Sequence, residues 1–256
     1  MKSLLAFIHK EMLEQRRSGK LIILGILFVV LGIMSPAIAK LTPWLMEMMA
    51  DTLAGSGLIF TSVSVSAMDS WTQFFKNMPI GLIAFVLIES SIFTREYQTG
   101  TLVLSLTKGM ERYKVVAAKT VVMVFLWTVS YWLCAGITYG YTAFFWDNAM
   151  VQHLLFSLAC WWVFGLFAVS LMVLFSTMAG SNTGVLAGTG SVVLGCYLLS
   201  FFSRLKKIMP TMLMDGTSLI YGMAKPDIYT VPLIIAAVMI PVCIAVSVIA
   251  FNRKQL

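Results

Sequence analysis

Six long apolar segments divide this chain, and few folds can accommodate them. An α-helix rises about 1.5 Å per residue, so roughly 20 apolar residues cross the hydrocarbon core of a bilayer. Only 11% of the residues are charged, and the mean hydropathy is +0.90. We therefore predict an all-α, polytopic membrane protein with one transmembrane domain over residues 1–256. Its six membrane-spanning helices are expected at residues 21–39, 79–93, 115–145, 153–178, 184–202 and 231–251.

The first 19 residues have the pattern of an amphipathic helix. Leu4, Ile8 and Met12 recur at helical spacing, and lysine, arginine and glutamate fill the other positions. Such a helix suits the boundary between membrane and water. We expect residues 1–19 to form an interfacial helix; a charged leader that only sets the topology is the alternative. A cleavable signal peptide is not expected, because no small-residue cleavage site follows the first apolar segment.

The distribution of basic residues predicts the orientation. Six spans place both termini on one side, and that side would carry 12 of the 18 lysines and arginines. The positive-inside rule makes the richer side cytoplasmic and brings its basic residues near anionic lipid headgroups. Arg204, Lys206 and Lys207 are exceptions, because they fall on the outer side. Either the connection over residues 204–230 turns back toward the membrane, or the span count is wrong there.

Two connections are less clear from the pattern. Residues 40–78 are expected to form a long loop, which contains either a surface element or a partly re-entrant segment. The second connection, residues 94–114, is a polar island between two spans. Thr101 is a good helix N-cap and Gly109 a good stop, with Leu102 the first of several apolar residues between them. We predict a short cytoplasmic helix over Leu102–Thr107, followed by basic residues.

The sequence lacks the motifs that would let this chain do chemistry alone. It contains no phosphate-binding G-x-x-x-x-G-K-[ST] loop, no H-E-x-x-H and no G-x-S-x-G. The four cysteines lie inside apolar segments and suggest neither disulfides nor a metal site. Glu89 is the lone acidic group of a predicted span; pairing with Arg95 or Arg112 is favoured over transport chemistry. We predict no catalytic residues, no metal and no nucleic acid, and an energy source on another chain.

The polar island also carries a family pattern. Arg95-Glu96, then Thr99-Gly100-Thr101-Leu102 and a leucine-rich turn, precede Arg112-Tyr113-Lys114 and a span. This pattern resembles the permease subunits of ABC-2 type transporters, as do the six spans and the amphipathic N-terminus. The proline that usually precedes the basic stretch is replaced here by Gly109.

The resemblance implies a partner and a set of contact residues. It implies two copies of an ABC ATP-binding subunit, which hold ATP and Mg²⁺, and a second permease copy, identical or paralogous. It places the protein in a bacterial plasma membrane, with a coupling helix between the second and third spans that docks on the ATPase. Carried over by position, the residues that couple to the ATPase are Arg95, Glu96, Gly100, Thr101, Leu102, Leu104, Leu106 and Arg112.

Two further groups of residues lie within the predicted spans. Trp127, Tyr131, Trp161 and Glu89 could line a cleft for hydrophobic or amphipathic cargo; packing or lipid-facing aromatic residues are the alternative. Small residues at four-residue spacing let helices approach closely. The glycines that we expect to pack in this way are Gly136, Gly140, Gly180, Gly184 and Gly188.

These observations favour a dimeric permease that exports a hydrophobic or amphipathic molecule. A peptide, such as an antimicrobial or cytolytic peptide, is the first candidate for the cargo. Drugs, lipids or sodium are the alternatives within the same family. A membrane scaffold or sensor without transport, or an intramembrane enzyme that uses Glu89, are the competing classes.

Overall fold

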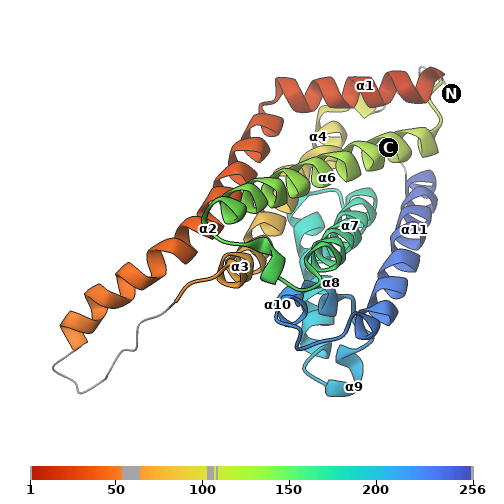
Figure 1. Cartoon of the computed structure of the whole chain (residues 1–256). Coiled ribbons are helices and arrows are strands. Elements are labelled where there is room, and N and C mark those ends of the chain that lie inside the picture. Colours follow the sequence, from red (N-terminus) through yellow and green to blue (C-terminus); the bar gives the residue numbers. More distant parts are fainter. Residues whose placement is uncertain (1, 54–63, 103–106, 108, 255–256) are drawn as a thin grey trace.

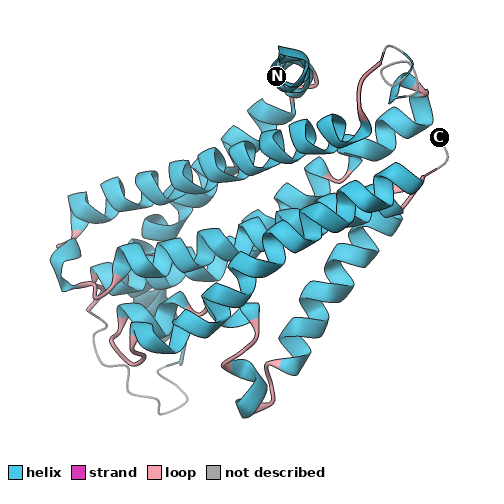
Figure 2. Ribbon diagram, turned by 90° about the vertical axis from the view of Figure 1, so that its right-hand side faces the viewer, coloured by secondary structure: helices cyan, strands magenta, loops and turns pink. Residues whose placement is uncertain are grey.

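The computed structural model describes residues 2–53, 64–102, 107 and 109–254. Within these ranges the chain forms helices and turns and no strand, which confirms the predicted all-α class. Six helical stretches are long and apolar enough to cross a membrane, also as predicted. They run side by side as a bundle (Figure 2). The six stretches are Lys20–Met48, Ala67–Thr99, Arg112–Phe145, Leu154–Met178, Asn182–Leu199 and Pro226–Arg253.

The N-terminal helix lies across one end of the bundle, the end at which both marked chain ends are found (Figure 1). The principal helices are α1 (Lys2–Arg17), α2 (Lys20–Leu53), α3 (Ala67–Glu89), α4 (Ser91–Thr99), α6 (Arg112–Phe145), α7 (Leu154–Met178), α8 (Asn182–Leu199) and α11 (Thr230–Arg253). Gly19, with φ of 76°, makes the turn between α1 and α2. The location of α1 at the membrane surface stays a prediction.

Much of the predicted loop over residues 40–78 is helical, so this expectation was wrong. α2 continues to Leu53, and α3 begins at Ala67. The start of α3 is a capping box, in which the Asp69 carboxylate accepts a 2.8 Å hydrogen bond from the backbone N–H of Ser66. The predicted second span, residues 79–93, therefore lies within a longer helical stretch, Ala67–Thr99.

The connection between α8 and α11 turns back against the bundle. It contains α9 (Ser203–Lys206), η3 (Pro210–Met214), α10 (Gly216–Ile220) and η4 (Pro226–Tyr229). Leu213, Leu219 and Ile220 are fully buried, and the Trp161 indole donates a 2.9 Å hydrogen bond to the Met214 carbonyl. The connection therefore folds back on the bundle, and its approach to the membrane stays a prediction. The six-span count holds, and α9 lies at the opposite end from α1 (Figure 1).

The core is centred on a tryptophan of α6. Trp127 is fully buried, with its ring 6.1 Å from Phe28 of α2 and 5.4 Å from Phe85 of α3. Its edge lies against Gly165 of α7, where a Cβ atom would come within 2.0 Å of the indole. A glycine at this position is thus what allows α7 to approach α6 around a large side chain.

Candidate functional site

Where α1 crosses the bundle, three helices, α1, α4 and α6, share a buried group of charges. We define the ion cluster as Lys10 and Glu11 of α1, Glu96 of α4 and Lys119 of α6. Glu11, Glu96 and Lys119 are 2%, 5% and 1% exposed. A buried charge is costly unless it is paired. The cluster therefore joins three helices in one arrangement.

Lys119 is the centre of the ion cluster. Its ammonium nitrogen lies 2.8 Å from an oxygen of Glu11 and 3.0 Å from an oxygen of Glu96. It also donates a 3.0 Å hydrogen bond to the Ile92 carbonyl and lies 5.3 Å above the Phe93 ring. All these partners come from α1 or the α3–α4 stretch. Lys119 therefore ties α6 to both.

Lys10 completes the charge balance from the surface side. Its ammonium lies 2.6 Å from Glu96 and 3.1 Å from Glu11. Partial burial by itself would lower the pKa of Lys10, but the hydrogen bond to Glu96 and the two nearby carboxylates outweigh burial and raise it. The cluster then holds two ammonium groups against two carboxylates.

The same acidic residues have the spacing of a cation site, but their surroundings argue against one. Oxygens of Glu11, Glu14 and Glu96 all lie within 4.8 Å of one another. Lys10 contacts all three carboxylates, the Glu14 contact being 3.5 Å, and Lys119 contacts two of them. Two ammonium groups already pair with the three carboxylates in this space, so we assign the carboxylates to ion pairs.

Glu89 is paired, as expected, but with other partners than those predicted. It is fully buried at the end of α3. The Gln15 side-chain amide donates a 2.7 Å hydrogen bond to it, and the Lys20 ammonium lies 3.6 Å away. Neither Arg95 nor Arg112 contacts it in the described part of the chain. Glu89 thus anchors the turn between α1 and α2, and its place in a substrate pathway is not supported by these contacts.

The predicted coupling residues lie in different surroundings. Arg95 is on the exposed side of α4, whereas the carboxylate of Glu96 points into the ion cluster, on the anchoring side. Thr101 is exposed and Leu102 is buried, and both have helical backbone. Leu104 and Leu106 lie outside the described residues, together with most of the predicted helix over Leu102–Thr107. Because Arg95 and Glu96 belong to α4, the connection to α6 is residues 100–111, which we call the 100–111 segment.

Two glycines bracket the 100–111 segment. Gly100 ends α4 with φ of 67°, and Gly109 has φ of 84°. These left-handed conformations favour glycine, and proline, fixed near −65°, cannot adopt them. Replacement of the usual family proline by Gly109 therefore gives the segment a different turn before α6.

Hydrogen bonds and a cation–π contact hold the C-terminal end of α11 next to residues on both sides of this segment. Nη1 of Arg112 lies 2.9, 3.1 and 2.6 Å from the carbonyl oxygens of Phe251, Asn252 and Lys254. The Lys254 ammonium donates to the carbonyls of Thr177 and Ala179, at 3.1 and 3.0 Å, and lies 4.0 Å above the Tyr97 ring. Cations at these positions satisfy the unpaired carbonyls at the ends of α11 and α7.

Replacing Lys254 with alanine should loosen the start of the 100–111 segment. The change removes both hydrogen bonds to the end of α7 and the cation above Tyr97. We expect a loss of about 1 kcal/mol in stability and faster limited proteolysis near residue 100. Arg253→Ala is the matched control, because Arg253 is exposed and its side chain makes no hydrogen bond or ion pair within the described ranges. Equal proteolysis rates in the two variants would contradict the fastening role.

The aromatic residues predicted to line a cleft are packed in the interior of the single chain. Trp127, Tyr131 and Trp161 are fully buried. Their polar atoms donate to backbone carbonyls: Trp127 to Trp162 at 3.2 Å, Tyr131 to Leu158 at 2.9 Å and Trp161 to Met214. The packing alternative therefore describes these three residues.

The five glycines that were predicted to pack between helices differ in what surrounds them. Only Gly188 of the five makes a close contact between helices in the described chain, where a Cβ would come within 2.3 Å of Phe175. Gly184 faces Ala179 across the local turn, and nothing lies within 4 Å of an added Cβ at Gly136, Gly140 or Gly180. The closest helix contact, at Gly165, was missed, because that glycine belongs to no small-residue repeat.

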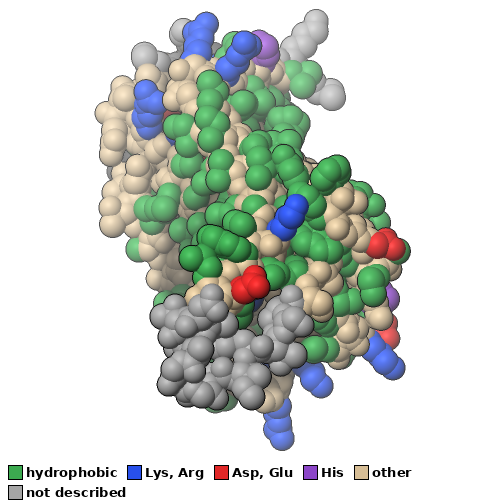
Figure 3. Space-filling view, turned by 60° about the vertical axis from the view of Figure 1, so that its left-hand side comes forward, with side chains coloured by type: hydrophobic (Ala, Val, Ile, Leu, Met, Phe, Trp, Pro, Cys, Tyr) green, Lys and Arg blue, Asp and Glu red, His purple; other side chains and the backbone are tan. Residues whose placement is uncertain are grey.

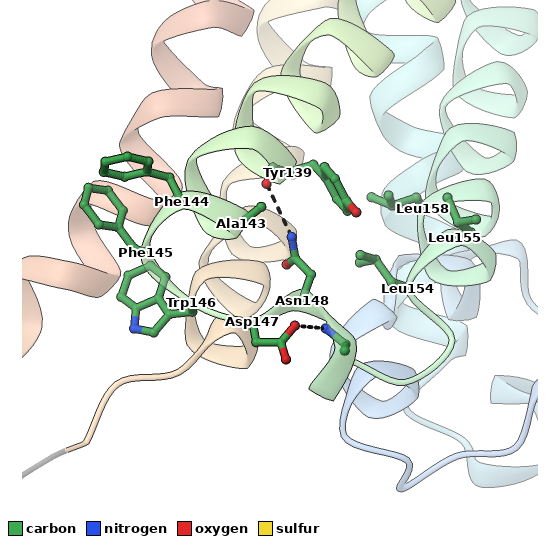
Figure 4. A pocket seen from close by; sticks show the side chains of 11 residues that line it. Tyr139, Ala143, Phe144, Phe145, Trp146, Asp147, Asn148, Leu154, Leu155 and Leu158 are labelled. Atoms are coloured by element: carbon green, nitrogen blue, oxygen red, sulfur yellow. Dashed lines mark hydrogen bonds between the residues drawn. The ribbon is translucent and has the colours of Figure 1, made fainter.

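Two grooves lie away from the ion cluster. At the opposite end, a space of about 960 Å³ lies between the end of α6 and the start of α7, and Figure 4 shows Tyr139, Phe144 and Leu154 around it. Asn148 lines it; its side-chain amide donates a hydrogen bond to the Tyr139 carbonyl and accepts one from the Trp71 indole. Between three of the membrane-crossing stretches, an apolar groove of about 240 Å³ is lined by α3, α7 and α8. Thr189 lines it, and its buried hydroxyl has no hydrogen-bond partner in the described structure.

Of the ion cluster, only Glu96 was among the predicted site residues, and Lys254 was not among them either. Glu11 had been grouped with the polar positions of an amphipathic helix, and Lys119 falls within the predicted third span, residues 115–145, where no role was given to it. One signal was present for Lys119: it follows Val115, Val116, Ala117 and Ala118, so it lies inside an apolar run. A lysine at such a position needs a buried partner.

Comparisons with known proteins found a matching family and a bacterial relative. Residues 5–256 match the model of a family described as "ABC-2 family transporter protein". The chain is also similar to the "uncharacterized transmembrane protein YxlG" of Bacillus subtilis (strain 168). The two are 24% identical over 212 residues, which cover 82% of this chain and 81% of the relative.

Proposed function

This chain belongs to the ABC-2 transporter family, and we propose that it is the permease subunit of an ATP-driven exporter in a bacterial plasma membrane. A separate ABC ATP-binding subunit supplies the energy and holds ATP and Mg²⁺. Two permease copies work with two such subunits, and both termini of each permease are cytoplasmic. The distribution of lysine and arginine supports this orientation.

The observation that carries the proposal is that the residues on both sides of the 100–111 segment are bonded to the helix bundle. It leaves the bundle at the end where α1 crosses, and its flanks are held rigidly. Glu96, on its N-terminal side, is tied to α1 and α6 through Lys10 and Lys119. Arg112, on its C-terminal side, is tied to the end of α11. A force applied by a partner to such a segment passes directly into α1, α4, α6 and α11.

The cargo is proposed to be hydrophobic or amphipathic, with a peptide as the first candidate. The apolar groove between α3 and α8 supports this, because its lining includes Leu82, Val86 and Leu186 with a single free hydroxyl at Thr189. Such a lining suits apolar groups with few polar contacts. Drugs, lipids or sodium stay alternatives within the same kind of transporter, and a scaffold or sensor is the alternative outside it.

Co-purification tests the proposal. The detergent-solubilised chain should retain a P-loop ATPase near one-to-one stoichiometry, identified by mass spectrometry. Changing Leu104 and Leu106 together to aspartate should release the ATPase, since these leucines are the proposed docking residues. Changing Tyr139 and Phe144, at the opposite end, to serine is the control and should leave it bound. A chain that retains no ATPase would favour the scaffold or sensor.

Gly100→Pro should uncouple ATP hydrolysis from transport. Proline cannot adopt the φ of 67° seen at Gly100, so α4 must end differently and the 100–111 segment must leave in another direction. In proteoliposomes that contain both subunits, we expect ATP hydrolysis to continue while transport falls at least tenfold. Gly100→Asn is the matched control, since asparagine tolerates the left-handed region. Unchanged transport in Gly100→Pro would contradict the coupling role.

A further inference from the structure

A groove of about 480 Å³ lies between α1 and α4, beside the ion cluster but separate from its buried core. One side is a single face of α1, on which Lys10, Leu13 and Arg17 follow each other at helical spacing, and the other side is Arg95 of α4. The adjacent face of α1 is packed inward through Phe7, Glu11 and Gln15, which are buried. The groove face therefore belongs to the side of α1 that is left open to the surroundings.

The groove carries a net positive charge, because Glu14 also lines it and offsets only one of its two arginines. The Lys10 ammonium forms ion pairs with Glu96 and Glu11, and Glu14 lies 3.5 Å from the same ammonium. Arg17 and Arg95 are exposed, and within the described ranges neither takes part in an ion pair. Two free guanidinium groups thus face one groove from two different helices. Guanidinium groups bind phosphate through paired hydrogen bonds.

The groove lies beside the ends of two membrane-crossing stretches, where lipid headgroups are expected. Arg17 ends α1 just before the first membrane-crossing stretch begins at Lys20, and Arg95 lies near the end of the second, Ala67–Thr99. The groove also offers apolar surface: Leu13 is 37% exposed within it, and exposed Leu21 and Ile22 follow at the start of α2. Figure 3 shows basic side chains gathered at this end of the molecule and a broad apolar surface farther along.

We propose that this groove binds the phosphate headgroup of an anionic phospholipid, with Arg17 and Arg95 on the phosphate and an acyl chain beside Leu13. Basic pockets of this kind at the cytoplasmic ends of membrane helices bind anionic lipid. The site goes beyond the transport role and does not depend on it. A bound lipid bridges α1 and α4 on the surface, as the ion cluster bridges them inside.

Native mass spectrometry of the purified full-length chain tests the site. The probes are phosphatidylglycerol and phosphatidylcholine with identical acyl chains, added in equal amounts. We expect wild-type protein to retain phosphatidylglycerol preferentially. The double variant Arg17→Gln, Arg95→Gln should lose affinity for it by roughly 25-fold, since each basic residue near the surface contributes about fivefold. Arg16→Gln is the matched control, because Arg16 is an exposed neighbour that does not line the groove.

Three outcomes would overturn the proposal. The first is equal phosphatidylglycerol binding by wild type and the double variant, with unchanged thermal stability to show that both are folded. The second is displacement of the lipid by millimolar glycerol phosphate, which would identify a soluble phosphate ester as the ligand. The third is loss of a co-purifying ATPase from the double variant with lipid binding intact, which would assign the arginines to an acidic protein surface. The lipid measurement uses the permease alone, so it can succeed or fail independently of the proposed transport function.

Discussion

Lys119→Met is expected to be the most destabilising single substitution in the ion cluster. The change removes the cation that lies 2.8 Å from Glu11 and 3.0 Å from Glu96 and leaves both carboxylates buried. Removing one partner of a buried pair typically costs about 3–5 kcal/mol. We expect a large fall in the midpoint of thermal unfolding in detergent, together with release of α1, measured as faster proteolysis between residues 17 and 20.

Lys114→Met is the matched control on the same helix. Lys114 pairs at 2.9 Å with Glu111, whose side chain is 55% exposed, so water screens the interaction and little stability is lost. Neutralising the two carboxylates that lose their cation tests whether the unpaired buried charges cause the lost stability. Glu11→Gln and Glu96→Gln, added to Lys119→Met, should recover part of the lost stability. If Lys119→Met and Lys114→Met unfold at the same temperature, the ion cluster does not hold the three helices together.

Gly165→Ala is expected to have the second largest effect. An added Cβ would lie 2.0 Å from the indole of Trp127, and that indole is enclosed by Phe28, Phe85 and Tyr131. The tryptophan cannot move without displacing three packed rings, so α7 must move away from α6. Overpacking of this kind costs about 1–3 kcal/mol or more. The measurement is the unfolding midpoint, with tryptophan fluorescence to report the displaced indole.

The control for this prediction is Gly136→Ala on α6. Nothing lies within 4 Å of a Cβ at Gly136, and alanine is the better helix former by about 1 kcal/mol. We therefore expect Gly136→Ala to unfold at the wild-type temperature or above. A tolerated Gly165→Ala would show that the α6–α7 contact adapts, and that the tryptophan does not set the distance between the helices.

The spans could be predicted from the sequence because the length of an apolar run is a local property. Residues 153–178 and 231–251 were located nearly at their observed bounds. The long loop at residues 40–78 was misjudged: α2 continues through Pro36 and Pro43, and α3 continues through Pro79. Proline in a membrane helix is tolerated when neighbouring groups satisfy the backbone.

The ion cluster could not be predicted for a different reason. Glu11, Glu96 and Lys119 are far apart in the sequence, and only the crossing of α1 over the bundle brings them together (Figure 1). Each had a plausible local role as a surface charge. In the same way, the density of tryptophan on α6 and α7 is compatible with a cleft or a core, and the choice depends on which helices lie opposite. The positions of Gly100 and Gly109 could be read more directly, because the left-handed turns they make are local.

The central claim is that a separate ATPase acts on the 100–111 segment, and photo-crosslinking tests it most directly. A photoreactive amino acid would replace Thr101, which is exposed, or Ala149, which is exposed at the opposite end of the bundle. In native membranes, the account predicts an adduct with a P-loop ATPase from position 101 and none from position 149. An ATPase adduct from position 149 alone, or from neither position, would contradict it.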